Sequence, residues 1–349
     1  MKPVTIPFFI SHQGCLHTCV FCDQRTISGS NGALPTKEQI HGKIDLWRST
    51  AGGRPLDVAF FGGTFTALSE EIQTGLLAPL QPFLDDGTVN SVRISTRPDC
   101  IDEDRVEWLS ERGVRVIELG VQSMDDTVLE ASGRGHAAAD SLAAIRCIKE
   151  YGLKVGAQLM PGLPGDTPLS SIASLEQVIS AGADFIRIYP TIVLQGTALA
   201  RLYKSGEFIP LSLDRGVALC KILLQRALQY GIPVIRIGLQ ADHGLNDESV
   251  LAGCWHPALG QLVRSQLYAD LIGNVVLPGR SVTVHCHPAR LSDVVGINRT
   301  NLQSQLERGV QMLVVPDATL QKEELKVKTE KSSVTYSIIT YINYSIHEV

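Results

Sequence analysis

The sequence contains the stretch Gly14-Cys15-Leu16-His17-Thr18-Cys19-Val20-Phe21-Cys22, in which three cysteines have the spacing C-x3-C-x2-C. Structural zinc sites and ordinary iron–sulfur clusters take four protein ligands. A 4Fe-4S cluster held by three cysteines alone would leave one iron with an open coordination position for a small molecule. The spacing therefore predicts a soft-metal site on Cys15, Cys19 and Cys22, with a 4Fe-4S cluster as its occupant.

A structural zinc site is the alternative, because His12 or His17 would supply the fourth ligand of a Cys3His set. The choice depends on whether the chain that follows builds a pocket for a cofactor.

The composition is that of a globular protein. The chain has 349 residues, of which 44% are hydrophobic and 19% charged, as expected for roughly two domains with a sizeable core. A formal net charge of -5 argues against a general polyanion-binding protein, although it leaves room for a local basic groove.

The spacing of the cysteines and the hydropathy of the sequence indicate the cellular compartment of the protein. Three of the eight cysteines are clustered and the others are scattered, which is not the pattern of a secreted disulfide framework. The sequence shows no signal-peptide pattern and no apolar run of membrane-spanning length. We therefore predict a cytoplasmic protein that does not contact a membrane.

Short apolar runs alternate with segments of helical period as far as residue 240, which predicts repeated βα units on a parallel sheet. Six units are fewer than the eight of a closed TIM barrel. We expect an α/β fold with a partial (β/α)6 barrel over residues 1–240. Its expected strands are residues 8–11, 58–61, 92–95, 116–120, 155–159 and 185–189, and its expected helices are residues 37–48, 70–83, 104–112, 138–151 and 169–181.

Residues 241–349 are expected to form a C-terminal extension and a small α/β appendix. In the second half of the chain we expect helices at residues 213–230, 257–271 and 298–308, and strands at residues 232–239, 282–285 and 312–315. A charged stretch (residues 322–331) and a β-prone stretch (residues 334–346) follow, and the pattern does not show what the latter packs against.

Glycine-rich and polar clusters follow the expected strands. Loops after the strands of a barrel gather on one rim, where cofactor sites form. Glycines there let the backbone approach a ligand closely. We therefore expect a cofactor pocket at this rim, lined by Gly62-Gly63-Thr64, Thr96-Arg97-Pro98-Asp99, Gln122-Ser123, Arg134-Gly135-His136 and Met160-Pro161-Gly162-Leu163-Pro164-Gly165.

Further motifs follow the cysteines in order, among them Phe60-Phe61-Gly62-Gly63-Thr64-Phe65-Thr66, Ser95-Thr96-Arg97-Pro98-Asp99, Glu118-Leu119-Gly120-Val121-Gln122-Ser123, Ile188-Tyr189-Pro190-Thr191 and Arg236-Ile237-Gly238-Leu239. Over roughly residues 5–260 their order and spacing resemble the radical S-adenosylmethionine (SAM) domain of the Elongator catalytic subunit family. We expect neither that family's acetyltransferase domain nor its basic RNA-binding extension from this sequence, and Ser95 stands where the family usually has glutamate. The resemblance alone therefore does not establish the family's chemistry on the tRNA wobble uridine for this chain.

The resemblance implies that SAM binds at the open iron. In related radical SAM enzymes, matching positions contact the amino group (Gly62, Gly63, Thr64), the adenine (Phe21), the ribose or methionine part (Gln122), the methionine carboxylate (Arg134) and the ribose hydroxyls (Gln158). Arginine suits a carboxylate because its planar fork binds both oxygens. Two alternatives stay open: Arg134 as a surface residue in a turn, and Gln158 as a satisfied core amide.

The implied function is that of a radical SAM enzyme. It would cleave SAM reductively to methionine and a 5′-deoxyadenosyl radical, which takes a hydrogen atom from an unidentified substrate, either RNA such as tRNA or a small metabolite. A low-potential donor such as flavodoxin or ferredoxin would supply the electron, and no general acid or base is assigned. The alternative is a non-catalytic iron–sulfur or zinc protein that binds RNA or a protein partner.

Two further groups of polar residues have an undecided role. Arg97, Asp99, Arg187 and Tyr189 would line the rim and hold a polar substrate, unless Arg97 and Asp99 simply pair with each other. The candidates for a second metal site are His285-Cys286-His287 and the pair Cys254 and His256. Buried cysteines and ordinary histidines are the preferred interpretation of these residues.

Overall fold

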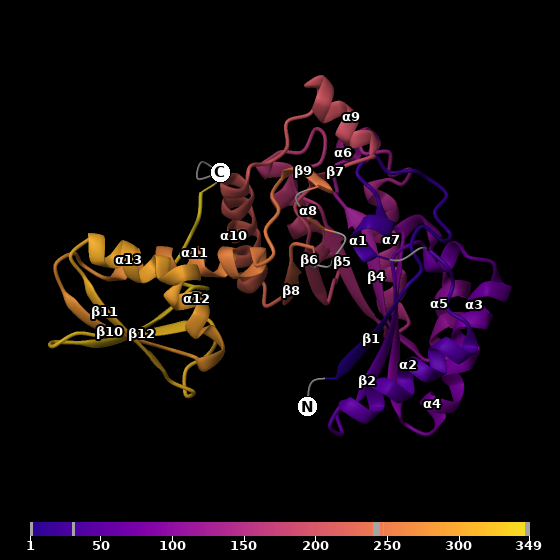
Figure 1. The fold of residues 1–349 in the computed structure, drawn as a ribbon, viewed down its shortest axis with the longest axis horizontal. Helices are drawn as coiled ribbons and strands as arrows, with labels where there is room; N and C mark the ends of the chain where they lie inside the picture. Colours follow the sequence, from indigo (N-terminus) through magenta and orange to yellow (C-terminus); the bar gives the residue numbers. More distant parts are fainter. Residues whose placement is uncertain (1–2, 30–31, 240–244, 247, 346–349) are drawn as a thin grey trace.

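The computed structural model describes residues 3–29, 32–239, 245–246 and 248–345. Its largest sheet has seven parallel strands in the order β1-β2-β3-β4-β5-β6-β8. The sheet is curled into a half-barrel with helices on its outside (Figure 1). The strands are β1 (Val4–Phe9), β2 (Leu56–Phe61), β3 (Val89–Thr96), β4 (Val114–Gln122), β5 (Lys154–Leu159), β6 (Phe185–Ile188) and β8 (Val234–Ile237). The predicted partial barrel is confirmed, and the strand expected at residues 232–239 extends its sheet to seven strands.

Helices alternate with these strands, and most of them begin where a side chain caps the free N–H groups of the first turn. Thr36 and Gln39 form a capping box at α2, and Thr167 and Ser170 form one at α8. The helices of this part are α1 (Gln24–Ser28), α2 (Lys37–Thr50), α3 (Glu70–Leu77), α4 (Gln81–Asp85), α5 (Glu103–Glu111), α6 (Asp126–Ala131), α7 (Ala138–Glu150), α8 (Pro168–Ser180), α9 (Ala198–Ser205) and α10 (Leu213–Gln229).

The two faces of the sheet differ in polarity, because successive residues of a strand point to opposite sides. Residues such as Val58 and Ile117 on the helix-covered face are completely buried in the main hydrophobic core. The inner face instead carries Arg93 from β3, Glu118 from β4 and Arg187 from β6. The curled sheet therefore has a polar inner face.

Two predicted elements differ in extent. The strand expected at residues 8–11 is β1, which runs from Val4 to Phe9 at the edge of the sheet. An edge strand tolerates Pro7, which has no N–H to donate.

The helix expected at residues 70–83 is divided into α3, a 3-10 turn (Ala78–Leu80) and α4, because Pro79 and Pro82 cannot donate helical hydrogen bonds. The short helices α1, α6 and α9 and the pair β7 (Ile192–Leu194) and β9 (Val250–Gly253) were not predicted.

The C-terminal part is a separate four-stranded sheet with its own helices, which confirms the α/β appendix. Its strands lie in the order β11-β10-β12-β13, with β10 and β11 parallel and the others antiparallel. Figure 1 shows it beside α10. The elements are α11 (Leu259–Val275), β10 (Ser281–Cys286), α12 (Leu291–Val295), α13 (Thr300–Glu307), β11 (Gln311–Pro316), β12 (Glu324–Lys328) and β13 (Ser333–Ser337).

The last stretch connects the appendix with the half-barrel. Its strand β13 pairs with β12, and the buried Ile342 that follows accepts a hydrogen bond from Gln225 Nε2 of α10 at 2.6 Å. Residue 346 of the predicted β-prone stretch and the domain boundary predicted between residues 240 and 241 lie outside the described residues. None of the helices described is long and apolar enough to cross a membrane.

The appendix provides a stability prediction at Asn301. Its buried Nδ2 lies 3.0, 3.3 and 3.1 Å from the carbonyl oxygens of Ser265, Asp293 and Val294. Asn301→Ala should lower the free energy of unfolding by about 2 kcal/mol, because buried carbonyls lose their donor. Urea unfolding measures the change. The exposed Asn274→Ala is the control, with a change of less than about 0.5 kcal/mol, and equal effects of the two substitutions would contradict the prediction.

Candidate active site

The cysteine loop (residues 12–24) is attached to the end of β2. The N–H of Ile10 donates to the Phe61 carbonyl at 2.9 Å, and the N–H of Thr64 donates to the Gln13 carbonyl at 2.8 Å. The Thr64 hydroxyl, which is completely buried, lies 3.7 Å from Cys15 Sγ. The first cysteine is thereby fixed beside the loop that follows β2.

Gly62 and Gly63 form a tight turn against this loop, and both have positive φ angles, of 77° and 62°. A Cβ atom on Gly63 would lie 2.4 Å from the carbonyl oxygen of Gln13 and 2.5 Å from that of Ile10. Only glycine fits so close an approach of two backbones. The predicted glycine turn therefore lies directly against the base of the cysteine loop.

The turn after α6 closes the other side of the cysteine loop. The N–H of Val20 donates to the Ser132 carbonyl at 3.1 Å. The imidazole of His17 lies over Gly135, where a Cβ would come within 2.7 Å of the ring. Residues more than a hundred positions away in the sequence thus pack against the cysteines.

Arg134, in the middle of that turn, points at a cysteine sulfur. Its Nη1 lies 3.2 Å from Cys19 Sγ, and its Nη2 donates to the carbonyl of Gly120 on β4. Only 6% of the residue is exposed, so the alternative of a surface arginine is wrong. Its Nε is buried without a hydrogen-bond partner, which fits a site where a ligand supplies an acceptor.

Gln122 and Gln158 meet at the rim. Gln158 Nε2 donates to Gln122 Oε1 at 3.2 Å. Gln122 has the left-handed φ of 71° at an irregularity between β4 and β5. Such a conformation is strained for a residue other than glycine and concentrates at functional sites. Their role toward the ribose stays a prediction, with the core amide as the alternative for Gln158.

The three thiols lie in a poorly solvated environment. Burial, together with the charges of Cys19 and Cys15, raises the pKa of Cys22 to about 12. Burial also raises the pKa of Cys15, against the hydrogen bond from Thr64. Thiols with raised pKa values, such as those of Cys15 and Cys22, become thiolates only with a compensating cation, which is what bound iron provides.

A multi-iron cluster fits these residues better than a single zinc ion. Zinc would draw its ligand sulfurs to about 2.3 Å from one point, whereas separate irons of a cluster bind separate cysteines. Within the described ranges, no three His, Cys, Asp or Glu side chains converge on one metal position. Of the two histidines of the zinc alternative, His12 is engaged through Nε2, which accepts from the Gln24 N–H at 3.0 Å.

Comparison with known families agrees with this arrangement. Residues 9–176 match the family described as the radical SAM superfamily, and residues 183–269 match the one described as the radical SAM C-terminal domain. The chain belongs to the radical SAM superfamily. Proteins of this superfamily are enzymes that use a 4Fe-4S cluster and SAM, so the predicted enzyme class and cofactors are confirmed.

Individual relatives include an uncharacterized protein of Methanocaldococcus jannaschii, 29% identical over 230 residues that cover 62% of this chain and 70% of that protein. The tRNA uridine(34) acetyltransferase of Dehalococcoides mccartyi is 30% identical over 181 residues, 45% of this chain but only 39% of that protein. The solved structure of archaeal Elp3 from Methanocaldococcus infernus has a TM-score of 0.62 at 20% identity, covering 93% of this chain and 72% of that one. The predicted resemblance to the Elongator family is confirmed, and the structural match shows the same fold.

Phe21 of the radical SAM motif is packed in a satellite core. It is 9% exposed and lies with Cys19, Leu163 and Leu199 in one apolar cluster. The N–H of Leu199 also donates to the Val20 carbonyl at 2.7 Å. The ring thus stabilises the back of the cysteine loop, and its predicted contact with adenine stays a prediction.

The inner face of the radical SAM barrel holds a buried ion cluster. Glu118 Oε1 lies 2.6 Å from Arg93 Nη1, and Glu118 Oε2 lies 2.6 Å from Arg187 Nε. Arg187 Nη1 also donates to the Tyr189 hydroxyl at 2.8 Å. Burial opposes the charge of Arg187, but Glu118 and Tyr189 outweigh it and raise the pKa of that guanidinium. Arg187 and Tyr189 therefore present a fixed polar surface below the rim.

Arg97 and Asp99 form a two-point ion pair with each other, through N···O distances of 2.9 Å. The structure therefore shows the alternative considered from the sequence, in which Arg97 and Asp99 pair with each other. A substrate contact would therefore use the pair as a unit.

The other cysteines and histidines considered for a second metal are placed differently. Cys254 and Cys286 are buried. Nδ1 of His256 accepts from the Ala258 N–H at 3.0 Å, and Nδ1 of His287 accepts from the Ala289 N–H at 3.1 Å. These contacts are local and structural, and a second metal centre stays without a supporting observation.

Two residues of this site were not predicted from the sequence. Glu118 lies inside a quoted motif but was assigned no partner, although a lone carboxylate in an otherwise apolar strand is a signal for buried pairing. Gln24, two residues after the last cysteine, contacts both the cysteine loop and the glycine turn. No spacing rule marks it, because its partners are backbone N–H groups.

Proposed function

We propose that this chain cleaves SAM reductively and directs the 5′-deoxyadenosyl radical to a substrate on the inner face of the half-barrel. The observation that supports this best is the meeting of three separate segments around Cys15 and Cys19: the cysteine loop, the turn at Gly63 and the turn at Arg134. When bound, the cluster and SAM supply a one-electron cleavage of the C5′–S bond that also yields methionine.

The chain's own residues hold and orient the reactants in this proposal. Cys15, Cys19 and Cys22 would hold the cluster. The backbone at Gly62, Gly63 and Thr64 would contact the amino group of SAM, and Arg134 its carboxylate. Gln122 and Gln158 would contact the ribose or methionine part, and Phe21 the adenine.

We further propose tRNA as the substrate class, with a small metabolite as the competing possibility. Support comes from the relative named tRNA uridine(34) acetyltransferase, of which this chain spans about two fifths. Because the formal net charge is -5, RNA contact would rely on local arginines and not on the bulk charge. A low-potential donor such as flavodoxin or ferredoxin would deliver the electron.

An anaerobic assay tests the chemistry. The reconstituted protein, reduced with dithionite and given SAM, should form 5′-deoxyadenosine and methionine in equal amounts. Protein with a full complement of iron and sulfide that forms neither would contradict the proposal and favour a non-catalytic iron–sulfur protein.

The substrate class needs a separate experiment. The nucleosides of total tRNA and the small metabolites are compared in cells with and without the gene, and a Cys19→Ala allele shows whether a difference needs the cluster. Purified tRNA should bind with an affinity that falls steeply with salt. A change confined to small metabolites would contradict tRNA as the substrate.

A further inference from the structure

We infer that Gln24 is a positioning residue that holds the cysteine loop and the Gly62–Gly63 turn in the relative position needed to bind SAM. The inference rests on the proposed function, because it takes that turn as part of the SAM site. Gln24 is neither a cluster ligand nor a matched SAM contact, and its role would lie in joining the two.

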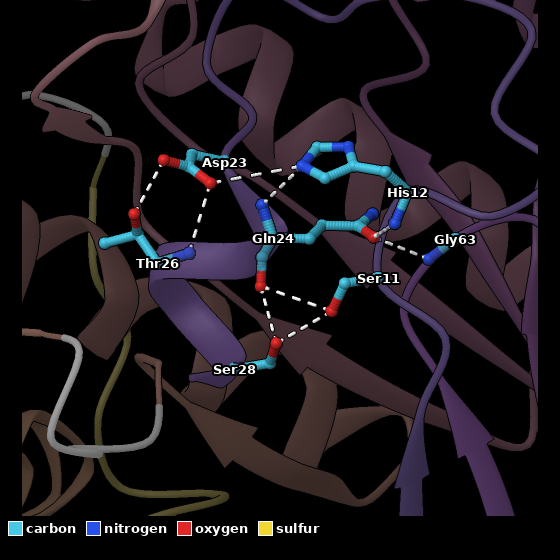
Figure 2. A network of polar contacts seen from close by, with 7 residues as sticks. All are labelled: Ser11, His12, Asp23, Gln24, Thr26, Ser28 and Gly63. Atoms are coloured by element: carbon cyan, nitrogen blue, oxygen red, sulfur yellow. Dashed lines mark hydrogen bonds and ion pairs between the residues drawn. The ribbon is translucent and has the colours of Figure 1, made fainter. Parts of the chain in front are cut away.

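One oxygen atom makes the connection. Gln24 Oε1 accepts the N–H of His12 at 2.7 Å and the N–H of Gly63 at 2.6 Å (Figure 2). Because both partners are donors, the atom between them must be the oxygen of the amide. The loop that follows β1 and the turn after β2 are thus held by the same side chain.

A second, reciprocal hydrogen bond closes the cysteine loop at its base. The N–H of Gln24 donates to His12 Nε2 at 3.0 Å. Two hydrogen bonds thus join His12, which precedes the three cysteines, to Gln24, which follows them. His12 has a left-handed φ of 61°, a conformation that costs free energy in a residue other than glycine. The two hydrogen bonds hold His12 in it.

Short-range contacts fix the direction of the Gln24 side chain. Asp23 caps helix α1 by accepting the Thr26 N–H at 3.1 Å and the Thr26 hydroxyl at 2.6 Å. The Ser28 hydroxyl donates to the Gln24 carbonyl at 2.7 Å and lies 2.7 Å from the Ser11 hydroxyl (Figure 2). These contacts fix the backbone of Gln24, and its side chain points toward the glycine turn.

Loss of the Gln24 side chain would change the position of the glycine turn relative to the cysteine loop, and not the cysteines themselves. Without Oε1 the N–H groups of His12 and Gly63 lose their acceptor inside a partly buried site, which is unfavourable unless the backbones move apart. The three sulfurs keep their own places on the loop. A site that still holds iron but binds SAM poorly is the expected consequence.

Three variants test the inference. Gln24→Ala removes the oxygen, and Gln24→Glu keeps an oxygen that accepts both N–H groups. Gln39→Ala is the matched control, because it removes a glutamine oxygen that also accepts a backbone N–H, that of Thr36 at the start of α2, outside the His12–Gly63 network. Iron and sulfide content report the cluster. The SAM-induced change in the electron paramagnetic resonance spectrum of the reduced cluster, titrated with SAM, reports the dissociation constant.

Gln24→Ala is expected to hold the full cluster while its dissociation constant for SAM rises about tenfold. Gln24→Glu should recover most of the affinity, and Gln39→Ala should match the unchanged protein. Gln24→Ala with unchanged SAM affinity would overturn the inference. Loss of the cluster together with loss of SAM binding would also overturn it. So would a Gln24→Glu protein that binds SAM no more tightly than Gln24→Ala, since both results indicate a role in folding alone. If the unchanged protein carries its cluster but neither binds nor cleaves SAM, the proposed function itself fails, and the inference with it.

Discussion

Cys19→Ala is expected to reduce SAM cleavage to the level of a sample without enzyme. The substitution leaves two of the three thiolates that we assign to the cluster, and two cysteines do not secure a 4Fe-4S centre whose remaining iron must stay open. It also removes the sulfur that lies 3.2 Å from Arg134 Nη1. Iron content, the visible absorption of the cluster and 5′-deoxyadenosine formation should fall together.

Cys147→Ala is the matched control for this experiment. Cys147 lies half-buried on α7, outside the loop, and its loss should leave iron content and SAM cleavage unchanged. A Cys19→Ala protein that keeps full iron and cleaves SAM would show that the C-x3-C-x2-C motif does not hold the cluster.

The site was largely predictable because it depends on the ends of parallel strands. In such a sheet these ends meet at one edge, so residues far apart in the sequence, such as Cys15 and Gly63, had to lie near each other once the βα pattern was recognised. The role of Arg134 toward the methionine carboxylate came from the family resemblance, whereas its burial against Cys19 was not predicted, because no periodicity in its own turn indicates it.

Other features needed the three-dimensional structure. The pairing of Glu118 with two arginines depends on the register of β3, β4 and β6, which the sequence does not specify. Strand β12 lay unrecognised in the charged stretch, although its Leu325 and Val327 alternate with exposed or half-exposed charged residues and are buried. This alternation of apolar and charged residues is typical of a strand, but the many charged residues of the stretch made it hard to recognise.

Glu118→Ala is the second substitution with a large expected effect. It leaves the guanidinium groups of Arg93 and Arg187 facing each other in the sheet without the carboxylate that lies 2.6 Å from each. Removing one partner of a buried charge cluster typically lowers the free energy of unfolding by about 3–5 kcal/mol. Anaerobic urea unfolding followed by circular dichroism measures the loss.

Two companion variants separate charge from shape in this experiment. Glu118→Gln keeps the volume and one acceptor oxygen but removes the negative charge, so it should lie between Glu118→Ala and the unchanged protein. Glu111→Ala removes a carboxylate whose contact with Arg112 is exposed, and it should change the free energy of unfolding by less than about 0.5 kcal/mol. If Glu118→Ala behaves like Glu111→Ala, water must reach the two arginines. The inner face would then be too well hydrated to shield a radical from solvent, which would count against the substrate position proposed above.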